Sequence, residues 1–157
     1  QPPVFVHRDY HSRNLMVCAG RNPGILDFQD AVHGPLTYDL VSLLRDCYVA
    51  WPQDKVVAWA LDFRRRAASA GLPVGADEQQ FLRWFDLMGV QRHLKASGIF
   101  ARLWHRDGKP GYLADVPRTL EYVAQACARH ADLAPLGELV AGRVLPAMRA
   151  SLGTPAA

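Results

Sequence analysis

The sequence predicts an α+β fold that is predominantly helical, with a small β-hairpin followed by about five helices. The first observation is a pair of short apolar runs, LMVCAG and GILDFQ, with the turn-forming residues RNPG between them. Such runs on either side of a Pro-Gly turn are typical of a hairpin, which we place at residues 15–28. The second observation is that apolar residues recur with the helical period from Leu36 onward, between residues that start or stop helices.

The ends of the expected elements follow from these signals. The opening QPPVFV is apolar enough to lead into a strand or a buried segment. A first helix is expected at residues 35–51, where one apolar stripe holds Leu36, Leu40, Leu43, Leu44, Cys47, Tyr48 and Trp51. The other helices are expected at residues 55–70 between Asp54 and Gly71, 78–94 after Asp77, 118–131 after Pro117, and 136–152 with a kink or split at Pro146. Residues 105–111 are expected to form a loop, and the terminal GTPAA is expected to fray.

Length and composition indicate one domain. The chain has 157 residues, 50% of them hydrophobic, which is enough to bury one core and too short for two comfortable ones. The net charge is +3, and the basic run Arg64–Arg66 lacks interleaved aromatic residues, so we expect a solvated helix face and no nucleic-acid partner. The tryptophans are expected in the core, with Trp51 the exception to watch: Trp51, Trp59, Trp84 and Trp104.

The cysteines indicate a reducing compartment. Cys18, Cys47 and Cys127 are odd in number, far apart and in no C-x-x-C pair, which argues against a disulfide framework or a zinc ribbon. No run approaches the roughly 18 unbroken apolar residues of a membrane span, and no signal-peptide pattern opens the sequence. We therefore expect a soluble, cytoplasmic protein with no membrane partner. Because the sequence begins at Gln1 without an initiating Met, it could be a piece of a longer chain.

The stretch HRDYHSRNL, residues 7–15, contains the candidate catalytic residues. It places the carboxylate of Asp9 five positions before the amide of Asn14, and a loop that ends at Asn14 and enters a strand would aim both into one cleft. The return strand would then bring Asp27 of LDFQD opposite Asn14. Phosphoryl transfer from a nucleotide needs a carboxylate that accepts the proton of the attacking hydroxyl, and oxygen ligands that hold Mg²⁺ against the phosphates. The sequence therefore predicts a magnesium–nucleotide site.

Two simpler interpretations compete with this one. An Asp near a loop is most often a cap or a turn residue, but the joint spacing of several residues disfavours that use here: Asp9, Asn14, Asp27, Gly34 and Asp39. A zinc cluster is also disfavoured because the spacing of the candidate ligands fits no zinc pattern: His7, His11, Cys18 and His33.

The order of these motifs resembles a known superfamily. HRDYHSRN followed by LDFQD resembles the catalytic loop and metal-binding motif of protein kinases, with Gln29 where those enzymes carry Gly. His11 indicates a family other than the protein kinases. The sequence resembles the aminoglycoside phosphotransferase and choline kinase superfamily, in which the order of motifs is H-x-D-x-H-x-x-N, then L-D-F, then a segment like HGPLTYDLVSLL. Over nearly the whole chain the likeness is greatest to one branch, the bacterial kinases that act on the anomeric carbon of N-acetylmuramate and N-acetylglucosamine.

The resemblance implies a protein-kinase-like C-terminal lobe and a role for each motif residue. Asp9 would be the catalytic base, and Asn14 and Asp27 would hold Mg²⁺ on ATP. Met16 and Leu26, which flank the metal ligands, would line the adenine pocket. His7 and Asp39 would be structural, with Asp39 fixing the loop by hydrogen bonds; the role of Asp30 stays open. The implied activity is an ATP-dependent transfer of phosphate to a small-molecule hydroxyl, the anomeric hydroxyl of an amino sugar in cell-wall recycling.

Sugar recognition is expected from polar residues on the helices. RDCY offers Arg45, Asp46 and Tyr48, which could bind hydroxyl and acid groups, although surface helix positions would look the same. QRHLK offers a second set, Arg92, His93 and Lys95. An aminoglycoside or choline kinase is the alternative, and it is less favoured because a cationic acceptor requires an acidic pocket.

One departure from the superfamily is large. The N-terminal lobe, with its phosphate-covering loop, lysine and hinge, is not encoded, so residues 1–157 are expected to be the C-terminal, catalytic lobe alone. The alternative, from a different functional class, is a kinase-like module that binds a ligand or partner without catalysing a reaction. The intact Asp9, Asn14 and Asp27 favour the enzyme, although the isolated piece is expected to be inactive.

Overall fold

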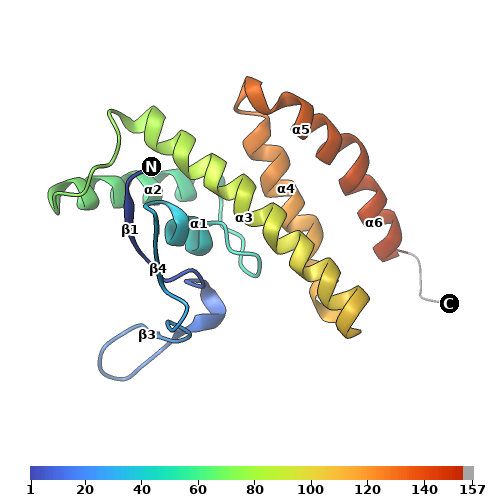
Figure 1. Ribbon diagram of the computed structural model, residues 1–157, viewed down its shortest axis with the longest axis horizontal. Coiled ribbons are helices and arrows are strands. Elements are labelled where there is room, and N and C mark those ends of the chain that lie inside the picture. Colours follow the sequence, from blue (N-terminus) through green and yellow to red (C-terminus); the bar gives the residue numbers. More distant parts are fainter. Residues whose placement is uncertain (154–157) are drawn as a thin grey trace. The chain divides into compact units, whose positions relative to one another are not determined.

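The computed structural model describes residues 1–153 and confirms an α+β fold dominated by helices (Figure 1). Residues 154–157, part of the end expected to fray, lie outside the described residues. The strands are β1 (Pro3–Val6), β2 (Leu15–Met16), β3 (Gly24–Ile25) and β4 (Val32–Pro35). The α-helices are α1 (Tyr38–Leu44), α2 (Gln53–Ser69), α3 (Glu78–Asp107), α4 (Val116–Cys127), α5 (Ala134–Leu139) and α6 (Leu145–Gly153). Short 3₁₀ turns cover Ser12–Asn14, Pro110–Asp115 and Ala131–Leu133.

The chain divides into two compact units, with the boundary between Met88 and Gly89 inside α3. Unit 1 contains the four strands, α1, α2 and the first turns of α3, and unit 2 contains the rest of α3 and the later helices. No helix among residues 1–153 is both long enough and apolar enough to cross a membrane.

The strands of unit 1 form two antiparallel pairs. The expected hairpin is confirmed with shorter strands, because β2 pairs with β3 through Leu15 opposite Ile25 and Met16 opposite Gly24. The strand expected from the opening residues is β1, and it pairs with β4, which lies beside it in Figure 1. The sequence did not predict β4, because VHGP contains Gly and Pro and shows no alternation of apolar and polar residues.

Helix α1 is shorter than the predicted helix at residues 35–51. It ends at Leu44, and Arg45 leaves the helical region with φ −121° and ψ 54°. The next residue, Asp46, accepts hydrogen bonds from the backbone amides of Ser12 at 2.7 Å and Tyr48 at 2.8 Å. Because these contacts hold the chain away from a helical path, the prediction that one helix reaches Trp51 was wrong.

The ends of α2 follow their sequence signals in part. Gly71 has φ +80°, and the amides of Gly71 and Leu72 bond to the carbonyls of Ala68 at 2.9 Å and Ala67 at 3.0 Å, so the stop at Gly71 is confirmed. Asp54 was predicted as the N-cap, but the helix already begins at Gln53. Asp54 therefore lies in the first turn, where its charge complements the helix dipole.

Helix α3 is capped as expected and runs further than expected. The Asp77 carboxylate accepts from the amide of Gln80 at 2.7 Å. The helix continues to Asp107, so the first three residues of the predicted loop at residues 105–111 are helical. Only Gly108, with φ +63°, and Lys109 separate α3 from the 3₁₀ turn that follows.

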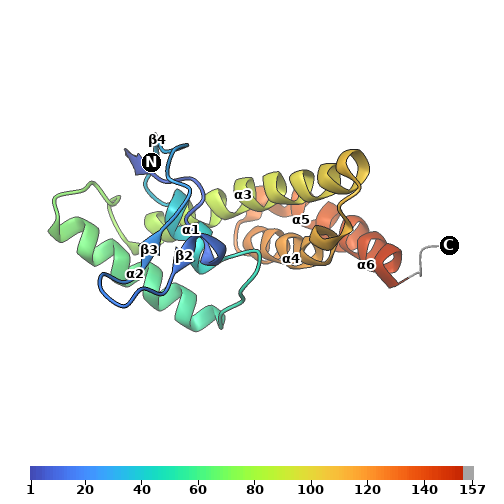
Figure 2. The ribbon, with the colours of Figure 1, turned by 90° about the horizontal axis from the view of Figure 1, so that it is seen from below.

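In unit 2, α4 lies alongside the run formed by α5 and α6 (Figure 2). Pro117 is in the first turn of α4, as predicted, and the last helical run is split, as predicted for Pro146. A π-helical segment, Val140–Val144, separates α5 from α6 and ends two residues before this proline. Proline has no N–H to donate to the carbonyl one turn earlier, so the regular bonding pattern cannot continue through it.

The core of unit 1 is built from α1, α2 and α3. Its buried side chains include Leu40, Val41, Leu44, Val56, Ala60, Phe81 and Phe85. The expectation that the tryptophans are core residues was wrong for three of them, because Trp51, Trp59 and Trp104 are exposed at 45%, 41% and 39%. Trp51 and Trp59 contact each other edge to face, with ring centroids 5.4 Å apart.

A buried ion pair crosses this core. Arg45, 3% exposed, donates from Nη2 to Oδ1 of Asp86 at 2.7 Å, and its guanidinium lies 4.5 Å from the centroid of the Phe85 ring. The pair joins the end of α1 to the first half of α3. Removal of one partner would leave the other charge buried without its counter-ion.

We expect Asp86→Ala to destabilise the protein by about 3–5 kcal/mol, because the Arg45 guanidinium would stay buried without its carboxylate. The matched control is Asp62→Ala, which removes an exposed carboxylate paired with Arg65 and Arg66 and is expected to change stability little. Urea unfolding followed by circular dichroism measures both. Equal midpoints for the Asp86 and Asp62 variants would contradict the structural importance of the buried pair.

Candidate functional site

The catalytic-loop candidate, residues 7–14, connects β1 to β2 inside unit 1. Asp39 was expected to fix this loop. In the structure its Oδ2 accepts from the amide of His7 at 2.6 Å and its Oδ1 from the amide of Arg8 at 3.0 Å. The carboxylate therefore joins the first turn of α1 to the start of the loop.

A second carboxylate holds the far end of the same loop. Asp46, just after the end of α1, accepts from the amide of Ser12 at 2.7 Å. Tyr48 adds an edge-to-face contact with the ring of His11, with centroids 5.5 Å apart. Residues at both ends of α1 thus position the loop. His7 is buried, and its ring lies edge-on to Tyr10 at 5.8 Å.

Asn14 and Asp27 lie opposite each other at the β2–β3 hairpin. The side-chain nitrogen of Asn14 is 2.9 Å from the carbonyl oxygen of Asp9 and 3.4 Å from Oδ2 of Asp27. The amide of Leu26 also bonds to the carbonyl of Asn14 at 3.0 Å. The structure therefore brings together the backbone of Asp9 and the side chains of Asn14 and Asp27.

Backbone strain is concentrated at this site. Among residues 1–153, the only non-glycine residues with positive φ are Arg8 at 79° and Asp27 at 64°. The left-handed region is unfavourable for a side chain such as that of Arg, and strained residues persist where surrounding contacts hold them. The bond from the Arg8 amide to Asp39 and the bonds that Asp27 accepts supply such contacts.

Asp9 has a carboxylate that is suited to accept a proton. Within residues 1–153, its side chain makes no hydrogen bond or ion pair, and the residue is half-buried. Its backbone is fixed, because its carbonyl accepts from Asn14 Nδ2 at 2.9 Å and from the amide of His11 at 3.0 Å. A fixed backbone with an unengaged carboxylate is the arrangement that a general base requires.

The donor set fits Mg²⁺. Asn14 uses its nitrogen for Asp9, and its amide oxygen has no donor within residues 1–153. Asp27 supplies a carboxylate, whose Oδ1 accepts from Gln29 Nε2 at 2.5 Å. Hard oxygen atoms of this kind are the protein ligands of Mg²⁺, which usually completes its shell with phosphate oxygens and water. Residues 1–153 contain no group of three or more His, Cys, Asp and Glu side chains that could hold a metal by themselves.

The predicted adenine-pocket residues lie on the hairpin. Met16 and Leu26 are both about half exposed, at 49% each. Other apolar side chains near them in the sequence are also exposed: Val17, Ile25 and Phe28. The hairpin thus presents apolar surface beside the two candidate metal ligands.

The predicted sugar-binding residues are differently placed. Arg45 and Asp46 are buried, and their side chains already bind Asp86 and the amide of Ser12, so a sugar would have to compete with these contacts. Tyr48 is half-buried against the loop. The second set, Arg92, His93 and Lys95, belongs to unit 2, where His93 packs on the ring of Tyr122.

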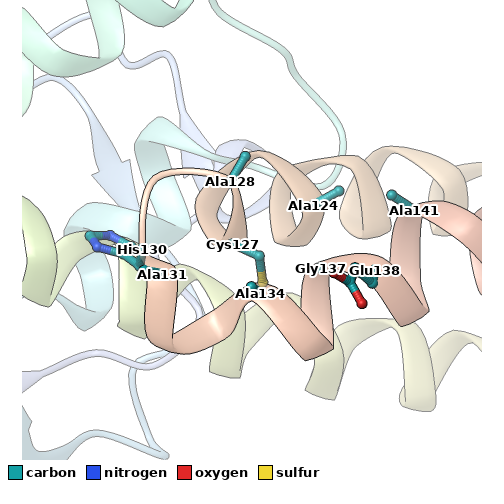
Figure 3. A pocket seen from close by; sticks show the side chains of 9 residues that line it. All are labelled: Ala124, Cys127, Ala128, His130, Ala131, Ala134, Gly137, Glu138 and Ala141. Carbon is teal, nitrogen blue, oxygen red and sulfur yellow. The ribbon is translucent and has the colours of Figure 1, made fainter.

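Two of the hollows formed by residues 1–153 lie outside the loop. One, of about 370 Å³, is in unit 1 and is lined by Leu40, Leu43, Leu44, Trp51 and Trp59. The other, also about 370 Å³, is in unit 2 between α4 and α5 and is lined mainly by alanines. In Figure 3 the Cys127 sulfur points toward Ala134, and the His130 ring points away from it. Burial raises the pKa of the Cys127 thiol, so this hollow offers no activated nucleophile.

Sequence reasoning missed two contacts of the site. Gln29 was noted as a departure from the kinase pattern, but its hydrogen bond to Asp27 was not expected. Arg13 was given no role, and its guanidinium carbon lies 3.6 Å from the centroid of the Tyr48 ring. No local signal connects two residues so far apart in sequence.

Comparison with known proteins identifies the family of this chain. Residues 1–82 match the phosphotransferase enzyme family. The chain is 57% identical over 141 residues to the N-acetylmuramate/N-acetylglucosamine kinases of Pseudomonas putida and Pseudomonas aeruginosa, which covers 90% of the chain. It is 53% identical over 140 residues to the enzyme of that name from Neisseria meningitidis, which covers 89% of the chain. The chain spans only 41–42% of the length of these curated relatives. Because the family match includes the loop, the hairpin and α1, the chain belongs to the phosphotransferase enzyme family.

Proposed function

We propose that this chain is the catalytic lobe of an ATP-dependent kinase that phosphorylates the anomeric hydroxyl of an amino sugar. The observation that carries the proposal is that the Asp9 backbone lies 2.9 Å from the side chain of Asn14, which is itself 3.4 Å from that of Asp27. The Asp9 carboxylate makes no hydrogen bond or ion pair within residues 1–153. The names of the relatives support N-acetylmuramate and N-acetylglucosamine as the acceptors. Both sugars occur in the bacterial cell wall, so a role in its recycling follows.

The residues of the loop would divide the work of phosphoryl transfer. Asp9 would orient the sugar hydroxyl and accept its proton as the oxygen attacks the γ-phosphorus in line. Asn14, through its amide oxygen, and Asp27 would hold Mg²⁺, which when bound neutralises phosphate charge. Asp39 and Asp46 would keep the loop in place, so that little motion is needed before the reaction.

The nucleotide would need contacts from outside this chain. Met16 and Leu26 offer one apolar surface for adenine, and the phosphate-covering loop and lysine of the superfamily have no counterpart here. We therefore infer that the remaining length of the relatives supplies an N-terminal lobe as the second wall of the cleft. Such a kinase would act in the cytoplasm, where ATP is available.

Two other functions are separated from this one by specific observations. A module that binds without turnover does not need an unengaged carboxylate on the loop that carries Asn14, so Asp9 argues against it. An aminoglycoside or choline kinase would need acidic groups for a cationic acceptor, whereas Asp39 and Asp46 are already bonded to loop amides. A phosphate-transfer screen of the full-length protein against amino sugars, aminoglycosides and choline tests all three functions.

The role of Asp9 predicts that Asp9→Asn in the full-length protein lowers kcat by about a hundredfold or more, because the proton acceptor is lost. Nucleotide affinity is expected to persist, since the variant keeps both metal ligands and the backbone carbonyl that binds Asn14. Steady-state kinetics and calorimetry with MgATP measure the two quantities. Wild-type turnover in this variant would remove Asp9 from the mechanism.

The metal assignment predicts that Asp27→Ala abolishes magnesium-dependent nucleotide binding and that Asn14→Ala weakens it. A carboxylate contributes more to a hard dication than a neutral amide does. Calorimetry of ATP binding with and without Mg²⁺ gives the comparison, with Asp30→Ala, three residues further on, as the control. If the Asp27 variant kept the magnesium dependence of the wild type, the metal site would lie elsewhere.

The inferred second lobe predicts a difference between the 157-residue chain and the full-length protein. The chain alone is expected to be helical by circular dichroism, to bind MgATP far more weakly, and to show no measurable sugar kinase activity. Its exposed apolar hairpin is also expected to promote association. Turnover by the purified chain that approached the full-length rate would show that it holds a complete active site.

A further inference from the structure

Arg13 has an unusual position within the catalytic loop. It is exposed, it directly precedes the metal-ligand candidate Asn14, and it follows Asp9 by four residues. Its guanidinium carbon lies over the ring of Tyr48, 3.6 Å from the ring centroid. The long cationic side chain of Arg13 thus packs on the aromatic ring of Tyr48.

The aromatic support is itself held by the loop contacts. The amide of Tyr48 donates to Oδ1 of Asp46 at 2.8 Å, while Oδ2 of the same carboxylate accepts from Ser12 at 2.7 Å. The Tyr48 ring also meets the ring of His11 edge to face at 5.5 Å. One carboxylate therefore fixes both the residue before Arg13 and the ring beneath it.

A guanidinium that lies on a ring uses its flat face for that contact. Its N–H donors lie in its own plane and are matched in spacing to the two oxygens of a carboxylate. Lysine cannot present the same pair of parallel donors. The stacked Arg13 is therefore shaped to recognise a planar anionic group.

Two other arginines near the loop, Arg45 and Arg8, are less exposed than Arg13. Arg45, the basic residue predicted to recognise the sugar, is 3% exposed and paired with Asp86 at 2.7 Å. Arg8 lies at the start of the loop, with its Nη1 directed to the carbonyl of Asp30 at 3.4 Å. Arg13 is the exposed loop cation that lies between the candidate base and the candidate metal ligand.

We propose that Arg13, supported by Tyr48, binds the carboxylate of an anionic sugar acceptor while Asp9 engages its reacting hydroxyl. This assignment rests on the proposed sugar kinase function and specifies it further. N-acetylmuramate carries a lactyl carboxylate that N-acetylglucosamine lacks. Arg13 would thus set the preference between the two acceptors.

The test compares the two sugars in one enzyme preparation. In the full-length protein, Arg13→Gln is expected to lower kcat/KM for N-acetylmuramate at least about tenfold, the usual loss for a hydrogen bond to a charged group. The value for N-acetylglucosamine is expected to stay within about threefold, so it also reports that the variant is folded and active. Arg21→Gln, an exposed arginine on the turn of the hairpin, is the control and should change neither value.

Variants of Tyr48, whose ring supports Arg13, and a lysine variant of Arg13 extend the comparison of the two sugars. Tyr48→Phe keeps the ring and is expected to keep the selectivity, whereas Tyr48→Leu removes the ring and should reduce it in the same direction as Arg13→Gln. Arg13→Lys retains the charge without the paired donors and should recover only part of the activity on N-acetylmuramate. The double variant Arg13→Gln/Tyr48→Leu should lose little more selectivity than Arg13→Gln alone.

The other outcomes overturn the assignment in distinguishable ways. An equal loss for both sugars in Arg13→Gln and Arg13→Lys would mean that Arg13 serves the nucleotide phosphates or the loop itself. Unchanged selectivity in both variants would mean that the carboxylate binds elsewhere, while the sugar kinase function would stand. A wild-type protein that phosphorylated neither sugar would overturn the proposed function and this assignment with it.

Discussion

The carboxylate of Asp39 is the contact on which the candidate site depends. It accepts from two successive loop amides, at 2.6 Å from His7 and 3.0 Å from Arg8. Hydrogen bonds to a charged acceptor contribute about 1.5–3 kcal/mol each. That contribution is comparable to the cost of about 1–3 kcal/mol for a sparsely populated backbone conformation such as that of Arg8. Without Asp39 the loop would lose the two hydrogen bonds that offset the left-handed turn leading into Asp9.

Helix α1 positions the two carboxylates that bind the loop. Asp39 lies in its first turn and Asp46 follows its end, and the two carboxylates bind opposite ends of the loop. The helix is short, but its inner face is buried in the core of unit 1 and the Arg45–Asp86 pair connects its end to α3. Because core packing and the Arg45–Asp86 pair hold the helix, and the helix holds the loop, a displacement of the loop would require the core to move.

The sequence predicted the opposition of Asn14 and Asp27 better than the ends of the helices around them. The opposition of Asn14 and Asp27 follows from a loop, a hairpin and a fixed number of residues, all of which are local. The early end of α1 was not predictable, because Arg45 and Asp46 fit a helical stripe and leave it only through contacts with Asp86 and Ser12. Pairing of β4 with β1 and the exposure of Trp51 and Trp59 likewise depend on tertiary contacts that no local pattern encodes.

The composition of the candidate metal site bears on the order of binding. One amide and one carboxylate would give a pair of protein ligands with a single negative charge. Mg²⁺ loses its water reluctantly and is held mainly where several anionic oxygens converge. The phosphates of the nucleotide would supply the missing charge, so the metal is expected to enter together with ATP.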